Sequence, residues 1–352
     1  LGLACLNTIA HSQTETRHKI ISTIAISLPT LLMVGGWLLW KLSYYGNILP
    51  NTFYAKADTD FLAIVLKRGS FYLIGFWLSY WLFPFLVLII YRIFKREIHS
   101  YEIIPFIILL IWTLYLFYIG GDFMEYRFMM PVLPLLMILI VATIAQYNNK
   151  YLLQAGLILI VLGGSVFHAI MFKLVASDMR MHHIDGMRNA QKHLYSDWDG
   201  IGKVLGDAFN YDRTITIATT PAGLIPYYSK ARIIDMLGLN DAWIARNGVP
   251  HLVQAGHERI STFDYLREQG VNLLIDHPKL ITNNELHEFS SELLDEFHVP
   301  LSLDDLPKNS LFLVIPINTG YDLLTIYLEP HPTIDKAIDT YGWATYPILD
   351  AN

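Results

Sequence analysis

Long apolar runs fill the first half of the chain and do not recur in the second half. Five stretches are uncharged and long enough to cross a hydrocarbon core, which takes about 20 residues. They are residues 20–40, 71–91, 103–120, 128–147 and 151–172, each bracketed by charged side chains. Because no soluble core of this size encloses five such helices in succession, the pattern predicts a polytopic α-helical membrane bundle over residues 1–173.

Basic side chains in the short loops predict the orientation of the bundle. Arg92, Lys95 and Arg96 form the densest basic cluster, after the second predicted span. The positive-inside rule places this loop in the cytoplasm. The loop at 41–70, the loop at 120–127 and everything after residue 173 are then expected on the outer side. For the segment from Thr52 to Val65, a helix along the membrane surface and a solvated loop both fit the pattern.

After residue 173 the hydrophobic patterns become shorter and are typical of strands and short helices. Alternating β-branched and apolar residues predict strands, and runs with helical spacing lie between them. Strands that alternate with helices predict a soluble α/β domain over residues 174–352, with Asn240 or Asp241 capping a helix. The predicted strands are 214–218, 231–236, 271–275, 311–315 and 323–328, and the predicted helices are 221–228, 242–247 and 285–297.

The composition agrees with this division and excludes several classes of protein. The chain is 53% hydrophobic and only 16% charged, and most of its acidic side chains fall after residue 173. No basic footprint for a nucleic acid is present. Cys5 is the only cysteine, which excludes disulfide frameworks and cysteine-based zinc sites, and we predict no metal site. The chain opens inside an apolar run without Met, so we expect residues 1–10 to be the tail of a longer hydrophobic segment and the chain to be a fragment.

The loop between the third and fourth spans carries the candidate chemistry. Gly120 and Gly121 allow a tight turn, and Asp122, Glu125 and Arg127 follow within six residues. Ionisable groups at a bilayer edge are costly unless they are paired, solvated or functional. If a helical turn follows the glycines, the two carboxylates share a face, and the planar guanidinium suits a phosphate. The alternative is that these charges mark the membrane boundary and pair with each other.

Three blocks of residues resemble the GT-C superfamily of polytopic glycosyltransferases. The resemblance is strongest to the group that contains the mycobacterial terminal β-(1→2) arabinofuranosyltransferase. The blocks are Tyr44-Tyr45-Gly46-Asn47-Ile48-Leu49-Pro50-Asn51-Thr52 with Ala55-Lys56, Gly120-Gly121-Asp122-Phe123-Met124 with Arg127, and Ile234-Asp235-Met236-Leu237-Gly238-Leu239-Asn240-Asp241.

The resemblance implies a transferase that moves a sugar from a polyprenyl-phosphate donor to a cell-envelope glycan or glycoconjugate. It implies the outer face of a bacterial inner membrane, lipid as a partner and no further cofactor. In the superfamily a carboxylate of the first outer loop is the general base, and that loop lies upstream of this chain. The chain has Glu125-Tyr126 where the mycobacterial group has His-Gly, so arabinose does not carry over.

Site residues follow from the resembling blocks. Asp122 and Glu125 are supporting catalytic candidates, and the candidate substrate-binding residues are Arg127, Lys56, Asn51, Tyr45, Asp235 and Asn240. Two of these assignments have structural alternatives. Instead of binding substrate, Lys56 would anchor lipid headgroups, and Asp235 would only end a strand.

Other motifs are interpreted structurally. The glycines at 200–206 do not form a dinucleotide fingerprint, Gly163 and Gly164 favour close helix packing within a span, and His182-His183 is an exposed pair. Two rival functions remain open. One is a non-catalytic scaffold for envelope assembly that is related to such transferases, and the other is a transporter.

Overall fold

The computed structural model describes residues 16–56, 62–147, 150–175, 181–185, 197–251, 257–282, 289–318 and 320–349. The chain divides into two compact units, Leu1–Pro50 with Thr59–His182 and Asn51–Asp58 with His183–Asn352. The predicted apolar start at residues 1–10 lies outside the described residues. The predicted domain boundary after residue 173 stays a prediction.

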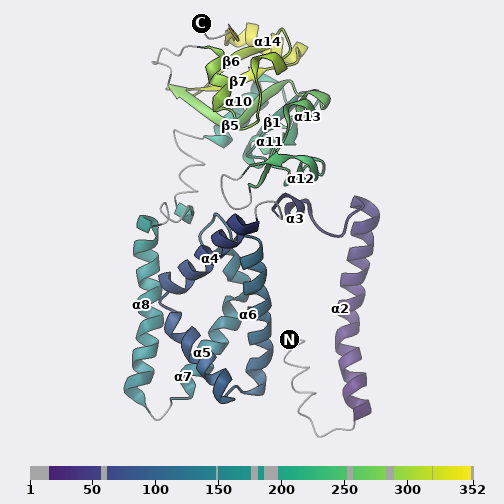
Figure 1. Ribbon diagram of the computed structural model, residues 1–352. Helices are drawn as coiled ribbons and strands as arrows, with labels where there is room; N and C mark the ends of the chain where they lie inside the picture. Colours follow the sequence, from purple (N-terminus) through teal and green to yellow (C-terminus); the bar gives the residue numbers. More distant parts are fainter. Residues whose placement is uncertain are drawn as a thin grey trace. The chain divides into compact units, whose positions relative to one another are not determined.

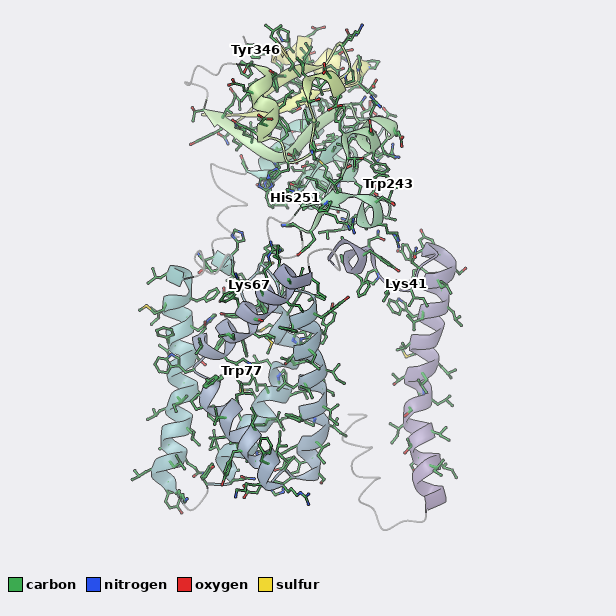
Figure 2. All side chains as sticks on the ribbon, viewed as in Figure 1. Lys41, Lys67, Trp77, Trp243, His251 and Tyr346 are labelled. Atoms are coloured by element: carbon green, nitrogen blue, oxygen red, sulfur yellow. The ribbon has the colours of Figure 1, made fainter. Side chains whose placement is uncertain are left out.

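Among the described residues, five helices of the first unit are long and apolar enough to cross a membrane, which confirms the predicted number of spans. The fourth of them begins with a 3-10 turn, η1 (Arg127–Val132), and continues as α7 (Leu133–Ala145). The others are α2 (Thr16–Tyr45), α4 (Leu62–Ser79), α6 (Ser100–Tyr118) and α8 (Tyr151–Val175) (Figure 1). Side chains such as Trp77 fill the core between the helices from α4 to α8 (Figure 2). The apolar segment of α2, in contrast, has no buried residue.

The second predicted span, 71–91, is wrong as a single helix. The apolar run forms the end of α4 and the start of α5 (Phe83–Lys95), which meet at an angle (Figure 1). Trp81 turns the chain with a φ of 56°, and Pro84 lies in the first turn of α5, where its missing N–H costs nothing. The helix α4 also begins earlier than predicted, so that Lys67 and Arg68 lie inside it instead of before it.

Two glycines of α8 pack against this break. A Cβ atom at Gly164 would overlap the carbonyl oxygen of Tyr80, and one at Gly163 would lie 2.8 Å from the ring of Trp81. The expectation that these small residues allow close packing within a span is therefore confirmed. Ser165, the next residue, donates its hydroxyl to the carbonyl oxygen of Val161.

A buried ion pair joins three helices at the other end of α5. Arg92 is fully buried, and its Nη2 lies 2.7 Å from Oε1 of Glu102 in α6. Its Nη1 donates to Oγ1 of Thr143 in α7 at 2.9 Å. Arg92 therefore serves the packing of α5, α6 and α7, while Lys95 and Arg96 remain exposed as the basic cluster of this loop.

The second unit contains a six-stranded mixed sheet, which confirms the predicted α/β domain. The strand order is β2-β1-β5-β7-β6-β8; β1, β2 and β5 are parallel, and the other pairings are antiparallel. Both faces are covered, because Leu273 and Ile275 point into one core and Leu274 into another. The strands are β1 (Thr216–Thr219), β2 (Arg232–Asp235), β5 (Leu273–Thr282), β6 (Leu311–Asn318), β7 (Tyr321–Tyr327) and β8 (Ala344–Pro347), with a separate pair β3 (Val249–Pro250) and β4 (Arg259–Ile260).

The helices of this unit were only partly predicted. Two predicted helices correspond to α11 (Leu224–Ser229) and α12 (Ile244–Asn247). In the described part of the predicted helix 285–297, a 3-10 helix, η2 (Ser291–Glu296), takes the place of an α-helix. The rest of that prediction, residues 285–288, lies outside the described residues. The pattern did not predict α10 (Trp198–Ala208), α13 (Phe263–Glu268) and α14 (Pro332–Tyr341). The glycines at 202 and 206 lie in α10, where a Cβ atom at Gly206 would lie 2.7 Å from the carbonyl oxygen of Tyr228.

A short helix from the loop between α2 and α4 belongs to the second unit. This helix, α3 (Asn51–Lys56), packs against α12, and the guanidinium of Arg246 lies 4.1 Å from the centre of the Tyr54 ring. Ala55 of the same helix is buried. The solvated loop is therefore wrong for residues 52–56, which form a packed helix. Residues 57–61 lie outside the described residues, and a position along the membrane surface stays a prediction.

We predict that an added methyl group distinguishes two glycines of α8. Gly164→Ala places a carbon against the backbone of Tyr80 and should destabilise the protein by about 1–3 kcal/mol. Gly156→Ala is the matched control, because nothing lies within 4 Å of the position of its Cβ atom. The measurement is the thermal unfolding of the purified full chain in detergent, and equal melting temperatures for the two variants would contradict this packing.

A second prediction concerns the buried ion pair. Glu102→Leu leaves the guanidinium of Arg92 without its carboxylate and should cost about 3–5 kcal/mol. The double variant Arg92→Met/Glu102→Leu removes both charges and should recover most of that loss. Thermal unfolding in detergent compares the three proteins, and a double variant no more stable than Glu102→Leu would rule out the uncompensated charge as the cause.

Candidate functional site

The loop at 120–127 leaves α6 through two glycines in the left-handed region. Gly120 has a φ of 79° and Gly121 a φ of 76°. A Cβ atom at Gly121 would lie 2.6 Å from the side chain of Tyr72, so only glycine fits against α4 here. No helical turn follows between residues 122 and 125. The conditional expectation that Asp122 and Glu125 share a helix face is therefore wrong, and the two carboxylates take different partners.

Asp122 and Arg127 form a bidentate ion pair. Nε of Arg127 lies 2.7 Å from Oδ2 of Asp122, and Nη2 lies 2.9 Å from Oδ1. The Asp122 side chain is 1% exposed, whereas the Arg127 side chain is 45% exposed. The guanidinium carbon also lies 5.6 Å and 5.1 Å from the ring centres of Phe123 and Phe128. Pairing between the charges is thus confirmed. The ion pair fixes the guanidinium through Nε and Nη2, so that Nη1 can donate to a further acceptor.

Glu125 pairs with a histidine that the sequence analysis missed. Nε2 of His168 in α8 lies 2.8 Å from Oε1 of Glu125. The His168 side chain is only 6% exposed and stacks on Tyr80 with ring centres 4.1 Å apart. The available signal was an ionisable residue inside a predicted span, which by default indicates a functional site.

Aromatic side chains of α4 and α6 hold the end of the loop. The backbone N–H of Phe128 donates to the hydroxyl of Tyr72 at 3.2 Å, and Trp112 Nε1 donates to the carbonyl oxygen of Phe128 at 2.7 Å. Tyr126 is fully buried with a φ of 33°, and its hydroxyl lies 3.0 Å from Oγ of Ser79. The loop is thus a fixed part of the bundle.

The segment after α8 pairs with the same loop. The N–H of His182 donates to the carbonyl oxygen of Phe123 at 2.7 Å, and the N–H of Glu125 donates to the carbonyl oxygen of His182 at 3.1 Å. The side chain of His182 is exposed, as predicted, and His183 is partly exposed. The backbone of His182, which the sequence did not single out, thus supports the loop.

The remaining predicted residues lie elsewhere. Tyr45 lies at the end of α2, where the described contacts of its ring are with Trp40 and Tyr44. Asn51 and Lys56 are the first and last residues of α3, in the second unit. The structure therefore brings together Asp122, Glu125 and Arg127 within one loop of the first unit, and roles for Tyr45, Asn51 and Lys56 in substrate binding stay predictions.

Asp235 and Asp241 build the turn from β2 to α12. Asp235 is buried, and its carboxylate accepts hydrogen bonds from the N–H groups of Leu237 at 3.1 Å and Asn240 at 2.8 Å. Burial raises the pKa of Asp235. Asp241 Oδ1 accepts from the N–H of Ile244 at 3.0 Å, so Asp241 caps the start of α12 as predicted. Substrate binding by Asp235 and Asn240 stays a prediction.

Three histidines gather near a buried aspartate within β5, at the point where the parallel pairing of β5 with β1 ends. Asp276 has a φ of 55°, and its Oδ2 accepts from the backbone N–H of His298 and lies 3.1 Å from His298 Nδ1. The rings of His251 and His277 have centres 5.4 Å and 5.7 Å from that of His298. Among the residues that the structure describes, no group of three or more histidine, cysteine, aspartate or glutamate side chains is arranged to hold a metal ion.

The three histidines have opposite pKa shifts. The hydrogen bond to Asp276 raises the pKa of His298, whereas desolvation and the neighbouring His298 lower the pKa values of His251 and His277. The sequence could not indicate this cluster, because its members come from β5 and from loops more than twenty residues apart. His251 is marked in Figure 2.

Comparison with known proteins gives two matches. Residues 69–199 match the Alg9-like mannosyltransferase family, and residues 185–342 match a domain of unknown function (DUF8728). No curated protein and no solved structure matches the chain. The first match contains the whole loop at 120–127 and supports the predicted resemblance to GT-C membrane glycosyltransferases, while the arabinofuranosyltransferase group stays a prediction.

We predict a pH-dependent effect of His298→Gln. Because the pKa of His298 is raised in the folded protein, its ion pair stabilises the fold fully below the ordinary histidine pKa and less as the pH rises through the raised value. The variant should therefore lose about 1–2 kcal/mol at pH 6 and less at pH 9. Thermal unfolding of the full chain at both pH values measures this, with His183→Gln as the control outside the cluster. A loss that is equal at both pH values would contradict the ion pair.

Proposed function

We propose that the chain carries the donor-binding part of a membrane glycosyltransferase of the GT-C type. The enzyme transfers a sugar from a polyprenyl phosphate to a cell-envelope glycan or glycoconjugate. The single observation that supports this most is the fixed guanidinium of Arg127, within the segment that matches the Alg9-like mannosyltransferase family. The reaction needs no nucleotide or redox cofactor.

The geometry of Arg127 suits the leaving group of this reaction. When the sugar departs, negative charge develops on the lipid phosphate, and a preorganised donor stabilises that charge without reorganisation. Asp122 binds Nε and Nη2, so Nη1 and the exposed 45% of the side chain are oriented for a phosphate oxygen. Asp122 is the positioning residue in this arrangement, because both of its oxygens are engaged by Arg127.

The donor sugar and the side of the membrane are further parts of the proposal. Mannose is the first donor to test, because the matched family consists of mannosyltransferases. The exposed Lys95 and Arg96, together with Lys150, favour a cytoplasmic position for their loops, which puts the loop at 120–127 on the outer face of a bacterial inner membrane. The second unit would then be periplasmic or extracellular.

One observation favours the alternative of a non-catalytic scaffold. The charge of Arg127 is already balanced by Asp122, as in a pair that only closes the end of a helical bundle. In that case the loop holds α4, α6 and α8 together, and removal of the guanidinium affects stability alone. The two functions therefore differ in what Arg127→Ala changes.

We expect Arg127→Ala to lower sugar transfer by about 10²-fold or more, while folded protein remains in the membrane. The measurement is transfer from polyprenyl-phosphate mannose by the full chain in proteoliposomes, at a donor concentration below KM. Arg96→Ala is the matched control, because Arg96 is exposed after α5. Unchanged turnover of Arg127→Ala would exclude phosphate binding by this residue, and a wild-type chain that does not bind polyprenyl-phosphate mannose would favour the scaffold.

A further inference from the structure

The second unit contains a cavity between the end of α10 and the helix α14. Its volume is about 680 Å³, which lies within the range of about 300–1,000 Å³ that is common for small-molecule sites. The whole lining falls within the segment that matches the domain of unknown function, and that match assigns no ligand to it. We propose that this cavity binds a neutral glycan. The inference rests on the proposed function in one respect, which is that this glycan is the acceptor of the transfer.

Part of the cavity lining belongs to the hydrophobic core of the second unit. Phe209 follows α10, is 1% exposed and lies edge-on to Trp343, with ring centres 5.9 Å apart. Ala337 of α14 also lines the cavity and belongs to the same core. Because these side chains are held by close packing, the cavity is a preformed feature of the fold.

Tyr341 gives the lining an exposed aromatic ring. It is the last residue of α14 and is 56% exposed. Its ring stacks on that of Trp343, with centres 5.8 Å apart and planes at 21° to each other. Trp343 is itself buried, so the stack holds the exposed ring in one orientation. Such a ring can pack against the apolar C–H face of a sugar, while its hydroxyl remains able to form a hydrogen bond.

The polar part of the lining offers both an acceptor and donors. Asp207 accepts the hydroxyl of Tyr211 at 2.5 Å through Oδ1, which orients the carboxylate. Its Oδ2 makes no hydrogen bond within the described part of the chain, and neither do the exposed side chains of Lys336 and Thr340. Sugar hydroxyls both donate and accept hydrogen bonds, so a ligand that carries several of them matches this mixture.

The charges of the lining disfavour an anionic ligand. Asp212 lies at the start of α14, where its Oδ2 accepts the hydroxyl of Thr333 at 2.6 Å. Hydrogen bonds from Thr214 and Thr333 lower the pKa of Asp212 to about 2, so the carboxylate stays charged. It thereby occupies the position at the helix N-terminus that favours an anion. With Asp207 as a second carboxylate and Lys336 as the one cation of the lining, a neutral glycan fits better than a uronate or a phosphate.

A divalent cation is the alternative ligand for two carboxylates. Both oxygens of Asp212 are already engaged, because Oδ1 accepts from the N–H and the hydroxyl of Thr214 and Oδ2 accepts from Thr333. Asp207 has one oxygen left, which is far fewer than the six to eight oxygen ligands that Ca²⁺ usually takes. The geometry therefore favours the glycan.

The test measures the binding of neutral trisaccharides of mannose, glucose, galactose and arabinose to the full chain in nanodiscs, without a sugar donor. Saturation-transfer NMR gives the Kd values, and we expect at least one trisaccharide to bind, whereas the anionic trigalacturonate should not. Tyr341→Ala loses the stacking surface and should raise the Kd by about 10-fold, while Tyr341→Phe keeps the ring and should stay within about threefold. Lys336→Ala loses a charged donor and should also raise the Kd by about 10-fold. Tyr227→Ala is the matched control, because Tyr227 is 64% exposed and lies outside the cavity lining.

The outcomes separate this inference from the proposed function. If none of the neutral trisaccharides binds, or if the wild type, Tyr341→Ala and Lys336→Ala have equal Kd values, the inference is overturned. Ca²⁺ binding that Asp207→Asn abolishes, without trisaccharide binding, assigns the cavity to a cation instead. If thermal unfolding shows that Tyr341→Ala is not folded, Lys336→Ala decides, because its side chain is exposed. A chain that transfers mannose but binds no trisaccharide contradicts the inference alone, and one that binds a trisaccharide but not polyprenyl-phosphate mannose contradicts the proposed function.

Discussion

The energetic cost of an unpaired charge near hydrocarbon shapes the first unit more than any other constraint. Arg92, Asp122 and Glu125 each have a partner within the protein, at 2.7 Å, 2.7 Å and 2.8 Å. These pairs connect α5 with α6, the loop at 120–127 with itself, and that loop with α8. A bundle of apolar helices has little directional preference, so such polar contacts determine which helices are adjacent and how they are aligned.

Hydrophobic length predicted the number of spans well, because crossing a membrane needs a long uncharged run and little else. It failed at residues 80–82, where apolar Tyr, Trp and Leu leave the pattern unbroken while the backbone turns. The only local signal was Pro84, which is compatible with the first turn of a new helix as well as with a kink. Five strands of the sheet were predicted for a similar reason, because short runs of apolar and β-branched residues mark buried strands such as β1, β6 and β7. The exposed strand β8 and the helices α10 and α14 were not predicted.

The candidate site also has one part that could be predicted from the sequence and one part that could not. The group from Gly120 to Arg127 was predictable, because its members are close along the chain and their chemistry is unusual at a membrane edge. The partners His168 and Tyr72 were not, because they come from α8 and α4 and approach the loop only through helix packing. The bidentate pairing changed the interpretation most, since both oxygens of Asp122 bind the guanidinium of Arg127, whereas Glu125 pairs with His168.

The docking of α3 on α12 has a consequence for how such a protein can evolve. The second unit consists of residues 51–58 and residues 183–352. The two units therefore alternate along the sequence instead of following one another. A cut at a single point cannot separate them cleanly, because a fragment that begins at residue 183 lacks Tyr54 and uncovers its contact with Arg246. Recombination that exchanges only the C-terminal region would therefore be selected against unless the donor sequence still accommodates α3.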